Sequence, residues 1–145
     1  MRSFLLIALT AGLVIPIVGC SSNKQVSTNL KPVIETLVSA TDSWNGDSYS
    51  YPEGQAQMTL LRITAPVGFR TPVHTHPQPG VAYVAKGKLD CVVTATNTKV
   101  FSAGDSFATT FGDTPHYCES VGTEAAVVFV SYAGVEGEPV TVPIK

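Results

Sequence analysis

The sequence predicts an all-β protein with a single folded domain. Beyond residue 20, no long stretch shows the 3.6-residue apolar period of an amphipathic helix. Short runs rich in β-branched and aromatic residues instead alternate with turns that contain glycine, proline, asparagine or aspartate. A chain of 145 residues has room for one domain of this kind. Many short strands at roughly ten-residue spacing indicate a closed barrel or two packed sheets.

Residues 1–19 are predicted to be a secretory signal and not part of the domain. Arg2 precedes an apolar run at residues 4–18, which is shorter than the ~20 residues that span a bilayer as a helix. The run ends in Ile17-Val18-Gly19-Cys20, which resembles the lipobox of bacterial lipoproteins. That resemblance implies cleavage before Cys20, acylation of Cys20, and a lipid anchor that holds the protein to a membrane of the cell envelope, on its periplasmic or outer-surface side. An uncleaved anchor and an ordinary signal cut elsewhere are the alternatives.

The rest of the chain divides into a polar tether at residues 20–30 and a folded domain at residues 31–145. The segment 31–40 is ambiguous, because its apolar residues could line one helix face while Pro32 and its β-branched residues favour a strand at least as much. Further strands are expected at residues 58–65, 81–85, 89–95, 99–101, 106–110, 116–120 and 125–132.

The charge balance argues against one class of partner. The chain has 9 Lys and Arg against 11 Asp and Glu, for a net charge of −2. The sequence contains no basic run, so nucleic acid is not an expected partner.

Three histidines are the strongest functional signal in the sequence. His74 and His76 are two residues apart, and on a strand they would present both imidazoles on one face. His116 follows a turn that leads into a later strand. If the three rings converge, they could hold a metal ion, and three protein ligands leave coordination positions open for water or substrate. The alternative is a barrel whose pocket binds a small molecule without a metal, or which mainly mediates contacts in an oligomer. Neutral imidazoles suit Fe, Zn, Ni or Cu, and the sequence does not distinguish among these or Mn.

The spacing of these residues resembles the two motifs of the cupin superfamily. Gly68, His74-Thr75-His76 and Gly87 match the first motif, and Gly104 and Thr114-Pro115-His116 match parts of the second. The resemblance implies a double-stranded β-helix, or jelly roll, with a divalent transition metal held by His74, His76 and His116. It also implies a small-molecule ligand and a possible homodimer formed through edge strands.

The sequence departs from the first motif at the glutamate that usually completes the metal site. Depending on the spacer length, Gly80 or Val81 stands at that position, and neither is a carboxylate. An uncompensated dipositive ion would favour an anionic or chelating ligand. Two functions fit: a metal-dependent oxygenase or isomerase acting on a small chelating molecule, and a non-catalytic module that binds or senses a small ligand.

Cys91 and Cys118 remain once Cys20 is assigned to lipid. An even number of cysteines in an exported protein predicts a disulfide, and two buried free thiols are the alternative. In cupins the two strands that carry these residues are neighbours, which allows a bridge. Cys118 as an additional soft metal ligand is a further alternative.

Three more polar residues are candidates near the site. Tyr83 is expected to line the pocket and donate a phenolic hydrogen bond, although a core aromatic is the alternative. Gln78 follows His76 closely and either approaches the metal or belongs to a rigid rim loop. Thr109 is the other side chain that could help to move protons there.

Overall fold

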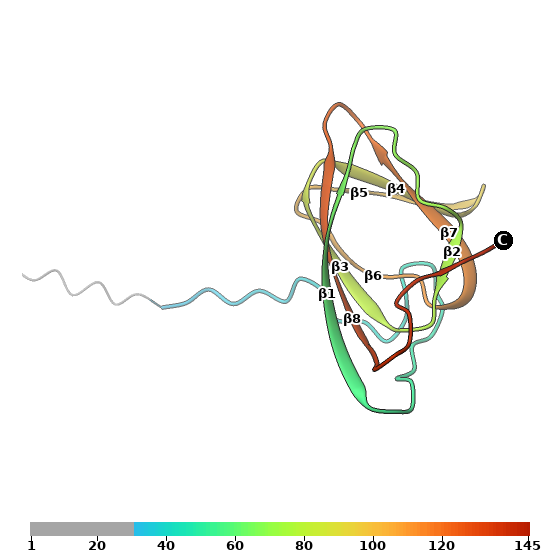
Figure 1. Ribbon diagram of the computed structural model, residues 1–145. Helices are drawn as coiled ribbons and strands as arrows, with labels where there is room; N and C mark the ends of the chain where they lie inside the picture. The colour runs from blue at the N-terminus through green and yellow to red at the C-terminus, as the bar shows by residue number, and fades with distance from the viewer. Residues whose placement is uncertain (1–30) are drawn as a thin grey trace, which may run out of the picture. The chain divides into compact units, whose positions relative to one another are not determined.

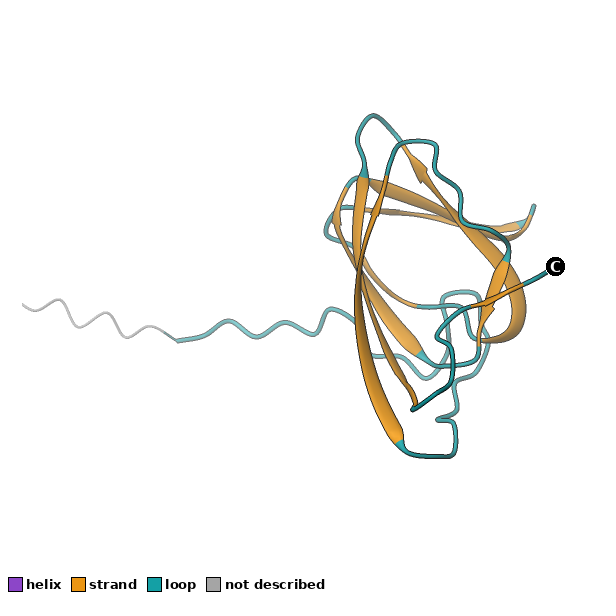
Figure 2. Ribbon diagram, viewed as in Figure 1, coloured by secondary structure: helices purple, strands orange, loops and turns teal. Residues whose placement is uncertain are grey.

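The computed structural model describes residues 31–145. The predicted signal at residues 1–19, Cys20 and the tether at residues 20–30 lie outside these described residues. Residues Ile34–Lys145 form one compact unit. Its regular structure is entirely β, because the described residues form strands and no helix (Figure 2). Across residues 31–145 there is accordingly no helix capable of spanning a membrane.

Two antiparallel sheets build the domain (Figure 1). The first has the strand order β1 (Ala56–Ala65), β8 (Ala126–Val135), β3 (Gly80–Lys86) and β6 (Ser106–Ala108). The second has the order β5 (Asn97–Ser102), β4 (Lys88–Thr94), β7 (Gly112–Val121), β2 (His74–His76) and β9 (Val142–Pro143). Strands distant in sequence are therefore neighbours, which is the jelly-roll architecture that the sequence predicts.

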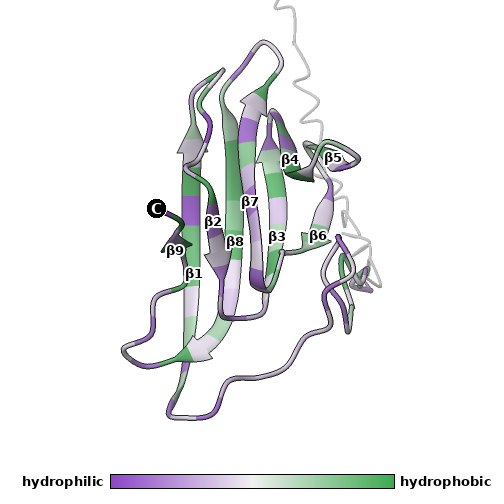
Figure 3. Ribbon diagram, turned by 90° about the vertical axis from the view of Figure 1, so that its right-hand side faces the viewer, coloured by the Kyte–Doolittle hydropathy of each residue, from purple (hydrophilic) through white to green (hydrophobic). Residues whose placement is uncertain are grey.

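The core lies between the inner faces of the two sheets. Side chains alternate along β8, where Ala126, Val128, Val130 and Tyr132 are buried and the intervening residues are more exposed. Figure 3 shows hydrophobic residues along β1, β8 and β3. Each buried valine here contributes about 1.5–3 kcal/mol to the free energy of folding relative to an exposed one.

Aromatic rings fill one part of this core. Phe101 and Phe107 stack with ring centroids 3.8 Å apart, and the edge of Trp44 meets Phe101 at 6.0 Å. Trp44 also donates a 3.1 Å hydrogen bond from its indole nitrogen to Thr110 Oγ1. These residues pack closely between the two sheets beside the candidate site. Trp44, Phe107 and Thr110 also form part of the wall of that site, so close packing holds the wall in place.

The cross-strand pair Cys91 and Cys118 is joined by a disulfide. The two residues are directly opposite in the β4–β7 ladder, with an S–S distance of 2.00 Å and a Cα–Cα distance of 4.1 Å. Cys91 is fully buried in the core, while Cys118 lies closer to the site. With its sulfur bonded to Cys91, Cys118 is not a free thiolate that could serve as a metal ligand.

The structure differs from the sequence prediction in the segment 31–40. It is neither helix nor strand, and the side chains of Val33, Ile34 and Leu37 are exposed. The physical reason is that this segment pairs with no strand in the part of the chain that the structure describes. Apolar content predicted a regular element, but a strand also needs a partner for its backbone groups.

Candidate metal centre

Two neighbouring strands bring the three histidines together. His74 is the direct partner of His116 in the β2–β7 ladder, and a register shift separates His74 from His76. All three side chains are buried, with 8%, 6% and 4% of their surface exposed for His74, His76 and His116. The short strand β2 therefore presents its two histidines to the interior beside the histidine of β7.

The imidazoles converge on one point. Ring centroids are 4.3 Å apart for His74 and His116, 4.8 Å for His74 and His76, and 5.0 Å for His76 and His116. One ligand nitrogen from each ring lies within 4.8 Å of the others. Nitrogens that share an ion at about 2.1 Å are about 3.0–3.4 Å apart, so small ring rotations suffice to bind one. The arrangement fits a metal ion.

Backbone carbonyls determine which ring nitrogen faces the shared space. His74 Nδ1 donates to Pro72 O at 2.7 Å, His76 Nδ1 donates to Val140 O at 2.6 Å, and His116 Nδ1 donates to Thr114 O at 3.3 Å. A proton on each Nδ1 leaves each Nε2 as the unprotonated nitrogen of its ring, the atom that could bind a metal. This is the tautomer that metal-bound histidines adopt when a second group orients the ring.

Burial keeps two of the rings neutral. Desolvation lowers the pKa of His76 to about 4, despite the opposing effect of its hydrogen bond to Val140. Desolvation is also the main reason why the pKa of His116 falls to about 4, with a smaller contribution from the neighbouring His74. Only the neutral imidazole binds a metal, so these two groups are ready for an ion throughout the physiological pH range.

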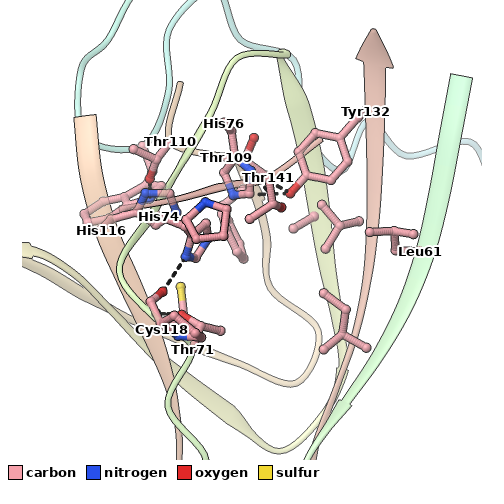
Figure 4. Close-up of a pocket in the computed structure, with 17 residues that line it drawn as sticks. Leu61, Thr71, His74, His76, Thr109, Thr110, His116, Cys118, Tyr132 and Thr141 are labelled. Carbon is pink, nitrogen blue, oxygen red and sulfur yellow. Dashed lines mark hydrogen bonds between the residues drawn. The ribbon is translucent and has the colours of Figure 1, made fainter. Parts of the chain in front are cut away.

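The histidines line one side of a pocket of about 260 Å³ (Figure 4). Leu61 lies on the opposite side of the pocket in this view. The walls away from the histidines are largely apolar, and the hydroxyl groups are close to the metal site. The apolar lining residues include Trp44, Leu61, Ile63, Ala82, Phe107 and Val130, and the hydroxyl residues include Thr109, Thr110, Tyr132 and Thr141.

Tyr132 is the polar residue in closest contact with the histidines. Its hydroxyl oxygen lies 3.3 Å from His76 Nε2 and 3.4 Å from His76 Nδ1. Burial raises the pKa of Tyr132, so the phenol stays protonated at neutral pH. Since His76 Nδ1 already carries a proton, the Tyr132 hydroxyl is the donor toward Nε2. A ligand bound at the centre could accept that hydrogen bond instead.

Thr109 provides a second hydroxyl in the pocket wall. The residue is buried, and its Oγ1 has no hydrogen-bond partner among the described residues. An unpaired buried hydroxyl costs free energy unless a ligand or water completes it. Thr109 Oγ1 is therefore a pocket hydroxyl that a bound molecule or a water could complete.

The prediction that Tyr83 lines the pocket is wrong. Alternation along β3 places Gly80, Ala82 and Val84 inside, so Tyr83 points outward and has 39% of its surface exposed. The aromatic hydroxyl of the pocket comes from Tyr132, which sequence reasoning missed. Its signal was present, because Tyr132 continues the inward alternation of Val128 and Val130.

Gln78 is buried, with 3% of its surface exposed, but it does not line the pocket. Its amide nitrogen donates to the carbonyl of Glu138 at 3.2 Å. Gln78 therefore contacts the chain that follows β8 and not the metal site.

Comparisons with known proteins agree with this geometry. The family model described as "Cupin domain" matches residues 61–132, which include all three histidines. No curated protein matches the chain.

Several solved structures share the fold. Oxalate oxidase in complex with the substrate analogue glycolate has 25% identity and a TM-score of 0.50, over 60% of this chain and 46% of that one. The polyketide cyclase RemF from Streptomyces resistomycificus has 16% identity and a TM-score of 0.51, over 63% of each chain. The DMSP lyase DddQ from Ruegeria pomeroyi DSS-3 has 19% identity and a TM-score of 0.50, over 59% of this chain and 42% of that one.

In each case the chain covers less than two thirds of the other protein. RemF and DddQ, at 16% and 19% identity, show a common fold only. The family match, the two antiparallel sheets and the paired histidine strands lead to the same conclusion: the folded part of this chain is a small domain of the cupin superfamily.

Proposed function

We propose that this protein holds a divalent transition metal with His74, His76 and His116 and uses it to bind and convert a small chelating molecule. The observation that carries the proposal is the convergence of three buried imidazoles whose Nδ1 atoms all donate to backbone carbonyls. Three Nε2 lone pairs facing one point suit Fe, Zn, Mn, Ni or Cu. A bound ion would supply Lewis-acid or redox chemistry at its open coordination positions.

The pocket defines the class of ligand. No carboxylate is present among the described residues that line it, so the positive charge of an ion would be left for the ligand to neutralise. The apolar walls suit a molecule with a hydrophobic body, and about 260 Å³ limits that body to a small one. The likeness to oxalate oxidase, which was solved with glycolate, supports a small acid with chelating oxygens.

Tyr132 and Thr109 favour catalysis over simple binding. A reaction such as oxygenation or isomerisation needs a group that can donate or accept a proton beside the open coordination positions. The Tyr132 hydroxyl, 3.3 Å from His76 Nε2, can donate to charge that develops on a ligand oxygen. Thr109 Oγ1 can orient the same ligand.

A non-catalytic binding or sensing module is the second candidate. The observation that favours it is the raised pKa of Tyr132, which makes the phenol a poor base at neutral pH. Binding without turnover would leave the metal requirement unchanged.

We further propose that acylated Cys20 anchors the domain to a membrane of the cell envelope. The lipobox-like run Ile17-Val18-Gly19-Cys20 supports this. The expected outcome is that radiolabelled palmitate enters the full chain in bacteria but not a Cys20→Ala variant.

We also propose a homodimer that forms through the edge strand β1 and covers the adjoining outer face of the four-stranded sheet. Exposed apolar side chains of Met58, Leu60, Tyr83 and Phe129 on β1, β3 and β8 support it. Sedimentation of the chain from Ser21 to Lys145 should give a dimer, and a monomer for Leu60→Asp.

Elemental analysis tests the metal site. The chain from Ser21 to Lys145, purified without added metal, should contain close to one transition-metal ion per chain, while His74→Ala and His116→Ala should lose it. Tyr83→Phe, on the outer face, is the matched control and should keep its metal. Equal metal content in all four proteins would contradict the proposal.

Turnover is then measured by oxygen uptake and product analysis with glycolate, oxalate and small apolar 2-hydroxy acids. Stoichiometric binding of one of these acids without product would favour the second candidate, the non-catalytic module.

A further inference from the structure

The chain that follows β8 packs directly against the candidate metal site. This C-terminal segment, residues 136–145, lies outside the residues 61–132 that match the family model. We propose that it is a positioning element for the metal ligand His76, and that Gln78 is the residue that holds the segment in place. The inference rests on the proposed function, because that function supplies the metal. Its structural part can be tested on the metal-free protein.

Backbone pairing attaches the segment to the strand that carries two of the ligands. β9 pairs with β2, with Pro143 opposite His74 and Val142 opposite Thr75. The Ile144 N–H adds a 2.9 Å hydrogen bond to Val73 O. β2 has only three residues and an irregular pairing with β7, so β9 gives it a second neighbour. The position of β2 therefore depends on both of its neighbouring strands, β7 and β9.

The three ligands differ in the origin of the carbonyl that orients them. His74 and His116 each donate to a carbonyl two residues earlier in the chain, at Pro72 and Thr114. His76 donates instead to Val140 O, 64 residues later, at 2.6 Å. Thr141 Oγ1 lies 3.4 Å from the same nitrogen. The ring orientation and tautomer of His76 thus depend on the C-terminal segment, whereas those of the other two ligands are determined locally.

Gln78 connects the start of this segment to the loop after β2. Its Nε2 donates to Glu138 O at 3.2 Å, two residues before the carbonyl that His76 uses. Its side chain also packs against Gly134, where a Cβ would lie only 1.8 Å from Gln78 Oε1. The absence of a side chain at Gly134 makes room for the amide. Gln78 is buried and polar without lining the pocket, and this contact accounts for its burial.

Three variants of the chain from Ser21 to Lys145 test the proposal. Gln78→Met keeps a side chain of similar length but removes the donor, and a chain that ends at Glu138 removes Val140 entirely. Glu138→Ala is the matched control, because the exposed Glu138 side chain is lost while its carbonyl remains. Loss of an orienting partner of a metal-bound histidine costs about 10–100-fold in metal affinity. We expect a tenfold or greater loss for the first two variants, measured by competition with a chelator, and none for the control.

The readout that separates positioning from general stability is the tautomer of each histidine. Long-range proton–nitrogen NMR of the metal-free proteins should show His76 losing its Nδ1–H preference in both test variants, while His74 and His116 keep theirs. An unchanged His76 tautomer in a folded Gln78→Met protein would overturn the role of Gln78. An unchanged tautomer in the truncated protein, or unfolding there with an unchanged Gln78→Met spectrum, would overturn the whole inference. If the wild-type protein binds no metal, the proposed function fails. The tautomer measurement still decides whether the C-terminal segment positions His76.

Discussion

Gly80 and Tyr132 face each other across the β3–β8 ladder, and the ring of Tyr132 occupies the space that a side chain at Gly80 would need. The two residues are direct partners, and a Cβ at position 80 would lie 2.7 Å from Tyr132 Cδ1. Gly80 is one of the two positions at which the cupin motif would have its glutamate. The site therefore has a neutral phenol next to His76 where a carboxylate would otherwise complete the metal site.

Removing the Tyr132 hydroxyl should affect the reaction and leave the metal in place. Tyr132→Phe keeps the ring that packs against Gly80 and removes the donor near His76 Nε2. We expect unchanged metal content and a change in stability of about 1 kcal/mol. Turnover should fall by about 100–1,000-fold, as for loss of one hydrogen-bond donor to developing charge. If no turnover exists, ligand affinity should fall by about 10–100-fold, as for loss of one hydrogen bond to a charged group. Wild-type turnover and affinity in this variant would show that Tyr132 has no part in the chemistry.

Adding a single methyl group at Gly80 should disrupt the site. In Gly80→Ala the new Cβ would meet Tyr132 Cδ1 at 2.7 Å and also Ser131 O and Thr109 Oγ1 at 2.9 Å. The backbone at Gly80 has an ordinary φ, so the effect is steric. Overpacking of this kind costs about 1–3 kcal/mol, which urea unfolding can measure. Unaltered stability would mean that Tyr132 can move aside without penalty.

Stability of the metal-free protein should fall as the pH decreases from about 6.5 to about 4. In the folded state burial holds the pKa of His76 and His116 near 4, whereas the unfolded groups titrate near 6.5. Within that window the unfolded chain takes up protons that the folded chain does not. At pH 5 each group should lower the free energy of unfolding by up to about 2 kcal/mol relative to pH 7.5.

Urea unfolding with a chelator present measures this effect. The double variant His76→Gln/His116→Gln, which lacks both titrating groups, should show a clearly smaller decrease. Equal pH dependence in the two proteins would mean that other groups cause it.

The disulfide should make a large contribution to stability. The bridge joins residues 27 positions apart, and closing a loop of that length is worth about 3–4 kcal/mol in the chain-entropy treatment. Cys91→Ala/Cys118→Ala should lose a comparable amount in urea unfolding. Thiol titration of the denatured chain from Ser21, before reduction, should detect no free thiol. Two reactive thiols in that titration would rule out the bridge.

The convergence of the three histidines could be predicted from the sequence, in part from a local pattern and in part from the resemblance to cupins. His74 and His76 share a face through strand alternation, and the motif spacing places His116 beside them. The choice of Tyr83 over Tyr132 failed for a different reason. Alternation gives each strand two faces, but cross-strand pairing decides which aromatic residue meets the site. Alternation with Val128 and Val130 marks Tyr132 as facing inward, but its pairing with Gly80 joins residues far apart in sequence, and no local pattern reveals that pairing.

The contacts made by residues 136–145 could not have been predicted from local patterns either. Val140 has no feature that marks its carbonyl as the partner of His76, because every residue has such a carbonyl. Conversely, the apolar residues of 31–40 suggested a regular element that the described part of the chain does not form. Long-range backbone contacts, and not composition, determine both outcomes.

The disulfide also divides the candidate metal site into two mechanically different halves. His116 is on β7, two residues before Cys118, and that strand is covalently tied to β4 through Cys91. His74 and His76 are on β2, which is held only by hydrogen bonds to β7 and β9. With the disulfide formed, an ion held at this candidate site would therefore enter and leave by displacement of the β2 side, with His116 as the stationary ligand.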